Sequence, residues 1–235
     1  MIGNNWIALV LTFGLALVWL RLNDFLAHRG IISGQLSRKF IHMGTGPIFV
    51  LCWLFFTPAP ESRYLAALVP FAITVQFAMV GLGIMKDPEA VAAMSRSGDR
   101  REILRGPLFY GIVFVLITLI YWRDTPIGIT ALMLLCGGDG LADIIGKRIK
   151  SPHLPWSPRK TVAGSLAVFG AGWIFTIFVL GIYQILAPFP GTLAGFLLPV
   201  TWIALAGTGV ESLPFQDIDN LTVPAVAILL GHLLF

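Results

Sequence analysis

Charged side chains are scarce in this chain of 235 residues: only 12% are Asp, Glu, Lys or Arg, whereas 57% are hydrophobic. A soluble domain normally carries a charged fraction of roughly 25%, so the composition excludes an ordinary soluble globular surface. Cysteine is also scarce. Cys52 and Cys136 both lie inside apolar runs and lack the spacing of metal ligands, so we interpret them as buried thiols rather than a disulfide or a zinc site.

Long uncharged runs occupy most of the chain instead. A helix crosses the hydrocarbon core with roughly 20 apolar residues, since each residue rises about 1.5 Å. Such runs cover residues 1–20, 40–60, 64–85, 106–122, 125–138, 161–210 and 221–235. The Pro188–Gly191 cluster divides the longest run in two, because proline lacks the amide hydrogen and breaks a helix. We therefore predict an all-α, polytopic transmembrane helix bundle of seven to eight spans, forming a single domain over residues 1–235.

The basic residues are distributed unevenly over the loops. The loops after spans one, three and five are rich in Lys and Arg, and only Arg63 and Arg123 fall on the other side. The positive-inside rule makes the rich side cytoplasmic, which also explains the net charge of +4 without nucleic-acid binding. The first run has no basic n-region, unlike a signal peptide, and the absence of an Arg- and Ser-rich leader favours a bacterial inner membrane or a mature organellar form.

Two acids at the end of the fifth span need an explanation. Asp139 and Asp143 share one helical face with their β-carbons about 6 Å apart, and Lys147 extends that stripe. Ionised carboxylates near a membrane are costly unless paired, hydrated or bound to a cation. Mg²⁺ prefers one or two carboxylates together with phosphates and water. The nearby glycines let another backbone or a ligand approach closely. The pattern predicts an ion or ligand site, and the alternative is pairing of both acids with Lys147 and loop cations.

The next polar stretch, residues 156–165, contains two prolines, the basic pair Arg159 and Lys160, and small residues at the start of a helix. Free amides at a helix N-terminus together with Lys160 suit an anion such as phosphate. An ordinary capped helix with snorkelling cations is the alternative.

Three more polar groups lie on the same predicted side of the membrane: Glu211 with Asp219 and Asn220; Arg38, Lys39 and His42; and Glu102. The first group either completes a metal site or forms a solvated loop. In the second group, Arg38 and His42 share a helical face, and a signal for membrane topology accounts for these residues as well as a binding site does. For Glu102, an ion pair with a neighbouring arginine is at least as good an explanation as a catalytic role.

With these motifs the sequence resembles the membrane-bound CTP-dependent isoprenoid alcohol kinases, most closely the phytol and farnesol kinase branch, with dolichol kinase more distant. The resemblance covers most of the chain from about residue 37 onward, and its central motifs are the most specific. The motifs that carry it are residues 38–42, 102–110, 138–146, 156–165, 211–214 and 219–222. The resemblance implies a transmembrane helix bundle, related to phosphatidate cytidylyltransferase, with the nucleotide on the cytoplasmic side.

The resemblance also implies transfer of the terminal phosphate of CTP to a long-chain prenyl alcohol (phytol, farnesol, geranylgeraniol or a longer polyprenol), with Mg²⁺ bound and CDP released. We expect Asp139, Asp143 and Lys160 to be catalytic, and Asp139, Asp143 and Asp219 to hold the metal. The residues expected to bind the nucleotide are Gly138, Lys147, Arg148, Arg159, Thr161, Gly164, Ser165, Arg38, Lys39, His42, Glu102, Glu211 and Asn220. One departure is that the last motif has only Asp219–Asn220 where relatives often show a further acid.

Two other functions fit some of the same features. A cytidylyltransferase would use the same nucleotide and metal but attack the α-phosphate, giving a CDP-lipid and pyrophosphate. A lipid or solute transporter would place its polar residues near the midplane of discontinuous helices, often in two repeated halves. Here they gather at one membrane face and no internal repeat is visible, which disfavours transport.

Overall fold

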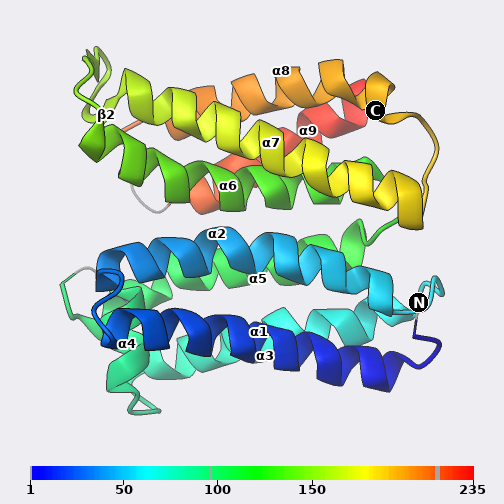
Figure 1. Ribbon diagram of the computed structural model, residues 1–235, viewed down its shortest axis with the longest axis horizontal. Helices are drawn as coiled ribbons and strands as arrows, with labels where there is room; N and C mark the ends of the chain where they lie inside the picture. The colour runs from blue at the N-terminus through cyan, green and yellow to red at the C-terminus, as the bar shows by residue number, and fades with distance from the viewer. Residues whose placement is uncertain (1, 96, 215–217) are drawn as a thin grey trace. The chain divides into compact units, whose positions relative to one another are not determined.

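The computed structural model describes residues 2–95, 97–214 and 218–235. Within these ranges only the backbone is described at Asp24, His28, Gly34, Gln35, Arg38, Ala93, Asp139, Asp143 and Lys147. The described chain is almost entirely helical (Figure 1), which confirms the predicted all-α class. In chain order its elements are α1 (Asn5–His28), α2 (Gly34–Cys52), η1 (Trp53–Phe55), α3 (Ser62–Leu82), α4 (Pro88–Met94), η2 (Arg100–Leu104), α5 (Gly106–Ile120), α6 (Pro126–Arg148), β1 (His153–Leu154), β2 (Ser157–Thr161), α7 (Val162–Leu186), α8 (Leu193–Glu211) and α9 (Asp219–Leu234).

Six helices among the described residues are long and apolar enough to cross a membrane: Asn5–Ala27, Ser62–Leu82, Arg100–Ile120, Pro126–Gly146, Val162–Leu186 and Leu193–Glu211. Two shorter apolar helices, Lys39–Phe55 and Asp219–Leu234, occupy the positions of the two remaining predicted spans. The polytopic helix bundle is thereby confirmed, and the count of seven or eight spans stays a prediction.

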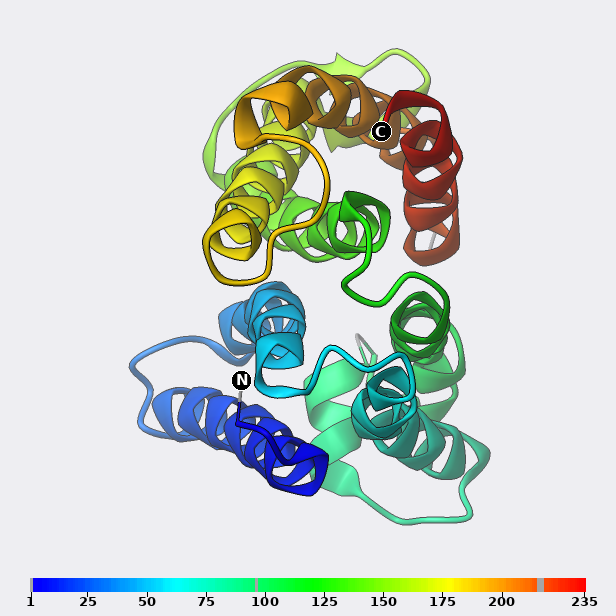
Figure 2. The ribbon, with the colours of Figure 1, turned by 90° about the vertical axis from the view of Figure 1, so that its right-hand side faces the viewer.

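The chain forms two compact units. Unit 1 consists of residues 1–41 and 55–120, and unit 2 of residues 42–54 and 121–235, so that α2 starts in unit 1 and continues into unit 2. Figure 2 views the helices of each unit nearly end-on. The prediction of a single domain stays a prediction.

In unit 1, α1 and α3 run in the same direction. The side-chain amide of Asn5, at the start of α1, donates to Thr57 Oγ1 at 3.1 Å and to Ser62 Oγ, at the start of α3, at 2.9 Å. At the far end of α3, Gly83 ends the helix in the left-handed conformation with φ of 79°, which only glycine adopts at little cost. The Arg100 guanidinium lies so close to Gly83 that a β-carbon there would clash with it.

In unit 2, α6 is the central helix: 81% of its most apolar 18-residue stretch is buried, against 33% for α7. Glycines on α6 explain how closely α7 approaches. A β-carbon at Gly137 would lie 3.0 Å from the carbonyl oxygen of Ala171, and one at Gly146 would lie 3.5 Å from the α-carbon of Gly164. The close approach predicted for these glycines is therefore that of another helix backbone.

Each unit carries most of its basic residues at one end. The two exceptions predicted from the sequence, Arg63 in unit 1 and Arg123 in unit 2, both donate to backbone carbonyls. Arg63 Nη1 lies 3.2 Å from the oxygen of Leu119 in the last turn of α5, and Arg123 Nη1 lies 3.1 Å from that of Trp53. A cation favourably meets the carbonyl oxygens left unpaired at a helix C-terminus, so these two arginines have a structural role.

Candidate functional site

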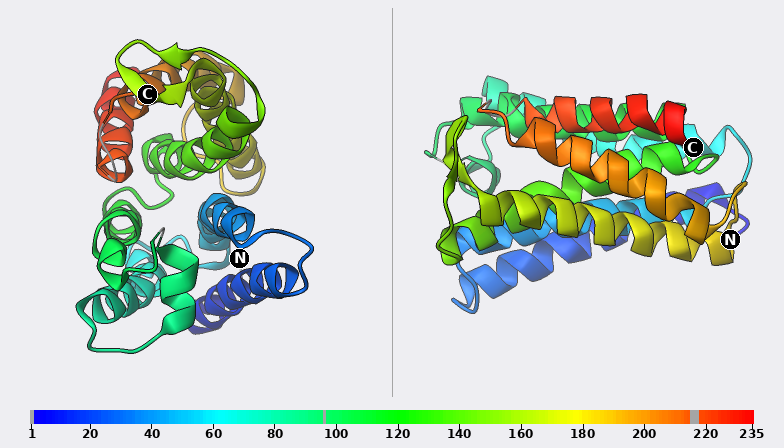
Figure 3. Two further views of the ribbon diagram at one scale, coloured as in Figure 1. Left: turned by 90° about the vertical axis from the view of Figure 1, so that its left-hand side faces the viewer. Right: turned by 90° about the horizontal axis from the view of Figure 1, so that it is seen from above.

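Four helices of unit 2 meet at one end, which we call the polar end. It comprises the last three turns of α6, the β1–β2 hairpin, the first turn of α7, the last turn of α8 and the first turn of α9. The antiparallel hairpin joins α6 to α7, with His153 opposite Thr161 and Leu154 opposite Ser157. It projects beyond the start of α7 (Figure 3). Residues 138–165 are thereby brought together with residues 211–214 and 218–223, which lie far away in the sequence.

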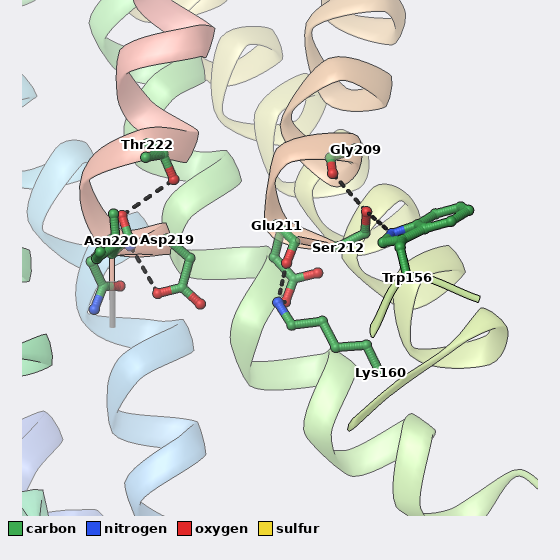
Figure 4. A network of polar contacts seen from close by, with 9 residues as sticks. Trp156, Lys160, Gly209, Glu211, Ser212, Asp219, Asn220 and Thr222 are labelled. Carbon is green, nitrogen blue, oxygen red and sulfur yellow. Dashed lines mark hydrogen bonds and ion pairs between the residues drawn. The ribbon is translucent and has the colours of Figure 1, made fainter. Parts of the chain in front are cut away.

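An ion pair joins the two segments. Lys160 Nζ, near the end of β2, lies 2.7 Å from Glu211 Oε1 and also donates to the backbone carbonyl of Glu211, the last residue of α8 (Figure 4). The side chains are 22% and 10% exposed. The ammonium therefore neutralises a buried carboxylate and satisfies a carbonyl at a helix C-terminus, where a cation is favoured.

A second contact fixes the hairpin to the same helix end. Trp156 Nε1, in the turn between the two strands, donates to Ser212 Oγ at 3.1 Å, and Ser212 Oγ donates to the carbonyl of Gly209 at 2.6 Å (Figure 4). The Trp156 ring itself is 56% exposed. Two side chains of one short hairpin thus contact adjacent residues of α8 and its C-cap, which holds Lys160 at a defined place.

A small cavity lies beside the ion pair. Its polar lining is Glu211, Asp219 and Asn220, and its remaining lining consists of Leu134, Leu135, Gly138, Val168 and Val223. The volume is about 20 Å³, enough for about one water-sized group. Asp219 Oδ1 accepts the backbone amide of Asn220 at 3.0 Å (Figure 4). Two of the predicted nucleotide-binding residues, Glu211 and Asn220, and the predicted metal ligand Asp219 therefore line one cavity.

The predicted acids of the fifth span lie on α6. The backbone of this helix is continuous through positions 139, 143 and 147, so these positions follow one another at intervals of about one turn. The side chains of Asp139, Asp143 and Lys147 lie outside the described residues, as does that of Arg38. Gly138, which precedes Asp139 in α6, lines the cavity. The backbone of this part of α6 therefore lies next to the cavity.

Three predicted nucleotide-binding residues lie at the start of α7: Thr161 at the N-cap, and Gly164 and Ser165 in the first turn. Thr161 Oγ1 accepts the backbone amide of Gly164 at 3.2 Å and so caps the helix, and Ser151 Oγ accepts the amide of Ala163 at 3.0 Å. Two of the amides expected to face a phosphate are thus satisfied within the protein. Ser165 Oγ is buried and has no hydrogen-bond partner among the described atoms, which leaves its hydroxyl as the side-chain donor of this turn.

The remaining predicted site residues divide between the units. Arg148 and Arg159 are exposed at the polar end of unit 2, and His42 lies on α2 within unit 2. Lys39 and Glu102 belong to unit 1. Glu102 accepts hydrogen bonds from the hydroxyl of Ser97 at 2.8 Å and from its amide at 3.3 Å. The predicted pairing of Glu102 with a neighbouring arginine stays a prediction.

The fit of a divalent cation rests on α6 and its surroundings. No group of three His, Cys, Asp or Glu side chains suited to a metal occurs among the described residues, which exclude the side chains of Asp139 and Asp143. Ser165 Oγ and Thr208 Oγ1, in α8, are buried hydroxyls without a described partner. Two acidic positions about one turn apart are a donor pair that Mg²⁺ accepts together with phosphates and water, and the metal stays a prediction.

Some contributors were missed from the sequence. The apolar cavity residues Val168 and Val223 lie within apolar runs, where nothing separates a residue lining a cavity from one facing lipid. The Trp156–Ser212 contact was also missed, although both residues fall in the motifs that carry the resemblance. A tryptophan close to two prolines and a basic pair, as in residues 155–160, is a signal from which the hairpin could have been predicted.

The helices and the polar end define a class of protein: a multi-pass membrane protein with an ionic site where four helix ends meet. Curated relatives make the class specific. The chain is 39% identical to a probable phytol kinase, chloroplastic, of Triticum aestivum over 214 residues, which is 90% of this chain and 71% of the relative. It is 37% identical to phytol kinase 1, chloroplastic, of Arabidopsis thaliana, over 90% of this chain and 70% of the relative.

Farnesol kinase, chloroplastic, of Arabidopsis thaliana is 37% identical, over 88% of this chain and 68% of its own length. The chain belongs to the phytol and farnesol kinase family. No family model matches the sequence, and no solved structure is similar to the chain. These relatives are named as chloroplast proteins, so the prediction of a bacterial inner membrane finds no support.

Proposed function

We propose that this protein is a prenyl alcohol kinase that transfers the terminal phosphate of CTP to the hydroxyl of phytol, farnesol, geranylgeraniol or a longer polyprenol. The observation that carries the proposal is the Lys160–Glu211 ion pair, because it places a cation among helix ends that also hold Asp139 and Asp143. Family membership supports the class of reaction, and the choice of CTP rests on the sequence resemblance.

The reaction needs charge neutralisation and in-line positioning more than covalent help from the protein. The alcohol oxygen forms a bond to the terminal phosphorus, and the bond from that phosphorus to the bridging oxygen breaks. CDP leaves with the electron pair of that bond, and the hydroxyl proton passes to a carboxylate at the polar end. Asp139 is our first choice for this acceptor.

The basic residues bind the triphosphate. Lys160 donates to a phosphate oxygen in addition to Glu211, since an ammonium has three donors. Arg148 and Arg159, both exposed, attract the anion from solution, and Lys147 and the Ser165 hydroxyl complete the donor set. Asp139 and Asp143 hold Mg²⁺, which when bound neutralises charge on the phosphates. Asp219 stays a predicted third ligand of this ion.

A product analysis tests the proposal. The purified protein in lipid nanodiscs is incubated with CTP, UTP, ATP or GTP and with phytol, farnesol, geranylgeraniol or a longer polyprenol, and the products are identified by mass spectrometry. We expect a prenyl monophosphate and CDP. A CDP-lipid with pyrophosphate would show a cytidylyltransferase, and no nucleotide-dependent product with any pair would refute the kinase.

A further inference from the structure

Trp156 is a residue of the polar end to which the proposed reaction assigns no part. Its ring lies in the turn of the β1–β2 hairpin and is 56% exposed. The Nε1–H group donates to Ser212 Oγ at 3.1 Å, so the one polar group of the indole is already satisfied within the protein. What the side chain presents to its surroundings is therefore the face of an aromatic ring.

The ring is also fixed in place. Pro155 precedes Trp156 and Pro158 follows it two positions later, and each proline restricts its own backbone φ angle. An interfacial tryptophan has an apolar ring that meets lipid and an N–H group that meets water and headgroups, whereas here the N–H group is bound to Ser212. A fixed ring that offers only its face suits a flat ligand that stacks on it, because little side-chain entropy is lost on binding.

Cations next to the hairpin indicate the charge of that ligand. Arg148 and Lys150 precede β1, and Arg159 lies in β2, and all three are exposed. None of these three has an ion-pair partner among the described residues. Their charge repels a cationic ligand and attracts an anion. An aromatic face beside unpaired cations therefore favours a ligand that combines a flat ring with negative charge, as a nucleotide does.

The spacing along β2 fits the two ends of a nucleotide. Trp156 directly precedes β2 (Ser157–Thr161), and Lys160 lies four positions after it, so at about 3.3 Å per residue their α-carbons are at most roughly 13 Å apart. The two side chains contact adjacent residues, Ser212 and Glu211, and the indole ring points away from the ammonium (Figure 4). Because ribose separates the base of a nucleotide from its phosphates, the groups that bind them must be separated as well.

From these observations we propose that the Trp156 indole is the nucleobase subsite: the base of the nucleotide stacks on its exposed face, while the phosphates lie at Arg159 and Lys160. Every base has a π face, so stacking on an aromatic side chain tolerates all of them. The indole therefore supplies affinity for a nucleotide over a bare phosphate and does not itself select cytosine. This inference rests on the proposed function, because it assigns a place to the base of the phosphate donor.

The test compares a ligand that has a base with one that has none. The protein in nanodiscs is titrated calorimetrically with CTP or with inorganic tripolyphosphate, in both cases with Mg²⁺ and without prenyl alcohol. We expect Trp156→Ala to weaken CTP binding about tenfold or more, the effect of losing one stacked base. The dissociation constant for tripolyphosphate should stay within about twofold, because the cations are unchanged.

Two further variants serve as controls. Trp156→Phe keeps an aromatic face and should bind CTP within about threefold of the original protein. Trp202→Ala removes an indole that is 55% exposed on α8, outside the polar end, and should change neither dissociation constant by more than about twofold.

Two results would overturn the subsite. An equal loss of CTP and tripolyphosphate binding in Trp156→Ala would show that the indole only holds the hairpin and Lys160 in place. Unchanged binding of both ligands would also overturn it, and a lower unfolding temperature confined to nanodiscs of anionic lipid would then identify the ring as a membrane anchor.

A photo-crosslink on the unmodified protein covers the case in which Trp156→Ala does not fold. The protein is irradiated in the presence of 5-iodo-CTP, whose base carries the photoreactive group, and the labelled peptide is identified by mass spectrometry. A label on Trp156 supports the subsite, and a label that spares Trp156 overturns it.

The binding measurements separate this inference from the proposed function. Binding of CTP that is weakened in Trp156→Ala while tripolyphosphate binding is retained supports the subsite even if no phosphate transfer is detected. If transfer to a prenyl alcohol is observed and the KM for CTP is equal in Trp156→Ala and Trp202→Ala, the subsite is wrong and the kinase stands.

Discussion

The two units use their acidic side chains differently. In unit 1 three acidic side chains accept hydrogen bonds from groups two to five residues away: Asp87 caps α4 by accepting the amide of Ala90, Asp99 accepts that of Arg101, and Glu102 accepts from Ser97. Asp87 also accepts from the side-chain amide of Gln76, 11 positions earlier, at 3.3 Å. In unit 2 the described ion pair joins residues 51 positions apart, Lys160 and Glu211. Local contacts stabilise the helix ends that carry them, whereas the long-range pair brings separate helices together and so creates a site.

Among the described candidate spans, the most deeply buried one belongs to unit 2 and the least buried one to unit 1. The most apolar stretch of α1 in unit 1 is 11% buried, and that of α6 in unit 2 is 81% buried. A helix that exposes most of its apolar surface faces lipid, whereas a helix surrounded by protein is where polar groups can be kept from lipid at membrane depth. The comparison supports our proposal that the chemistry lies in unit 2, and the following experiments test that proposal from the largest expected effect to the smallest.

Replacing an acid of α6 should have the largest effect. We expect Asp139→Asn and Asp143→Asn each to lower kcat for phosphate transfer about a thousandfold, because the proposed metal loses a charged ligand. The measurement is transfer of γ-labelled phosphate to farnesol over a Mg²⁺ titration. Asp124→Asn, before the start of α6 at the opposite end of unit 2, is the control and should change the rate less than about threefold. Full activity in both α6 variants would remove the metal site from this helix.

Removing the Lys160 ammonium should lower kcat/KM for the nucleotide about a hundredfold, the effect of one lost donor to a reacting phosphate. Lys160→Met also leaves the buried Glu211 carboxylate uncompensated, which costs about 3–5 kcal/mol of folding free energy. The double variant Lys160→Met/Glu211→Gln removes both charges and should recover most of the thermal stability but not the activity. Recovery of activity in the double variant would show that Lys160 is only structural. Lys150→Ala, exposed in the adjacent loop, is the matched control.

Packing of α6 against α7 gives a third, smaller effect. Gly137→Ala places a methyl group 3.0 Å from the carbonyl oxygen of Ala171. Backbone cannot move aside as a side chain can, so we expect a loss of about 1–3 kcal/mol in unfolding free energy. At Gly170 on α7 nothing lies within 4 Å of the added carbon, and Gly170→Ala should be neutral or slightly stabilising. Thermal unfolding in detergent measures both, and equal behaviour would contradict the close approach of the two helices.

A cap in unit 1 should have the smallest effect. Asp87→Ala removes the acceptor for the Ala90 amide, which lies 2.9 Å from Asp87 Oδ1, and should cost about 1 kcal/mol of stability. The kcat should not change, and Asp87→Asn, which retains an acceptor, should lie within about 0.5 kcal/mol of the original protein. A loss of activity in Asp87→Ala as large as that in Lys160→Met would contradict the proposal that the chemistry lies in unit 2.

The sequence predicted the membrane-immersed parts of the helices better than the helices themselves. α2 starts at Gly34 and α6 continues to Arg148, whereas the corresponding uncharged runs start at Phe40 and end before Asp139. Hydropathy reports burial in lipid, but backbone hydrogen bonding continues into water. The short helices α4 and η2 were not predicted for a related reason, because they lie in a charged loop where no apolar periodicity marks them.

The sequence analysis identified the segments that form the site, but it did not predict which residues of these segments contact one another. The motifs around Lys160 and Glu211 were both identified, but nothing in a sequence pairs two residues that far apart. The amide of Gly164 was expected to face a phosphate and instead donates to Thr161, because a threonine before a helix favours the N-cap position. Val168 and Val223 had no sequence signal, since apolar residues are expected everywhere in a membrane helix.

The distance along the chain between Lys160 and Glu211 has a consequence for biosynthesis. A ribosome adds about 5–20 residues per second, so the hairpin emerges roughly three to ten seconds before the carboxylate that will hold it. During that interval the lysine and the indole of Trp156 have no α8 to contact. Membrane insertion of α8 is thus the event that allows the Lys160–Glu211 ion pair to form, and a nascent chain halted before it would lack this contact.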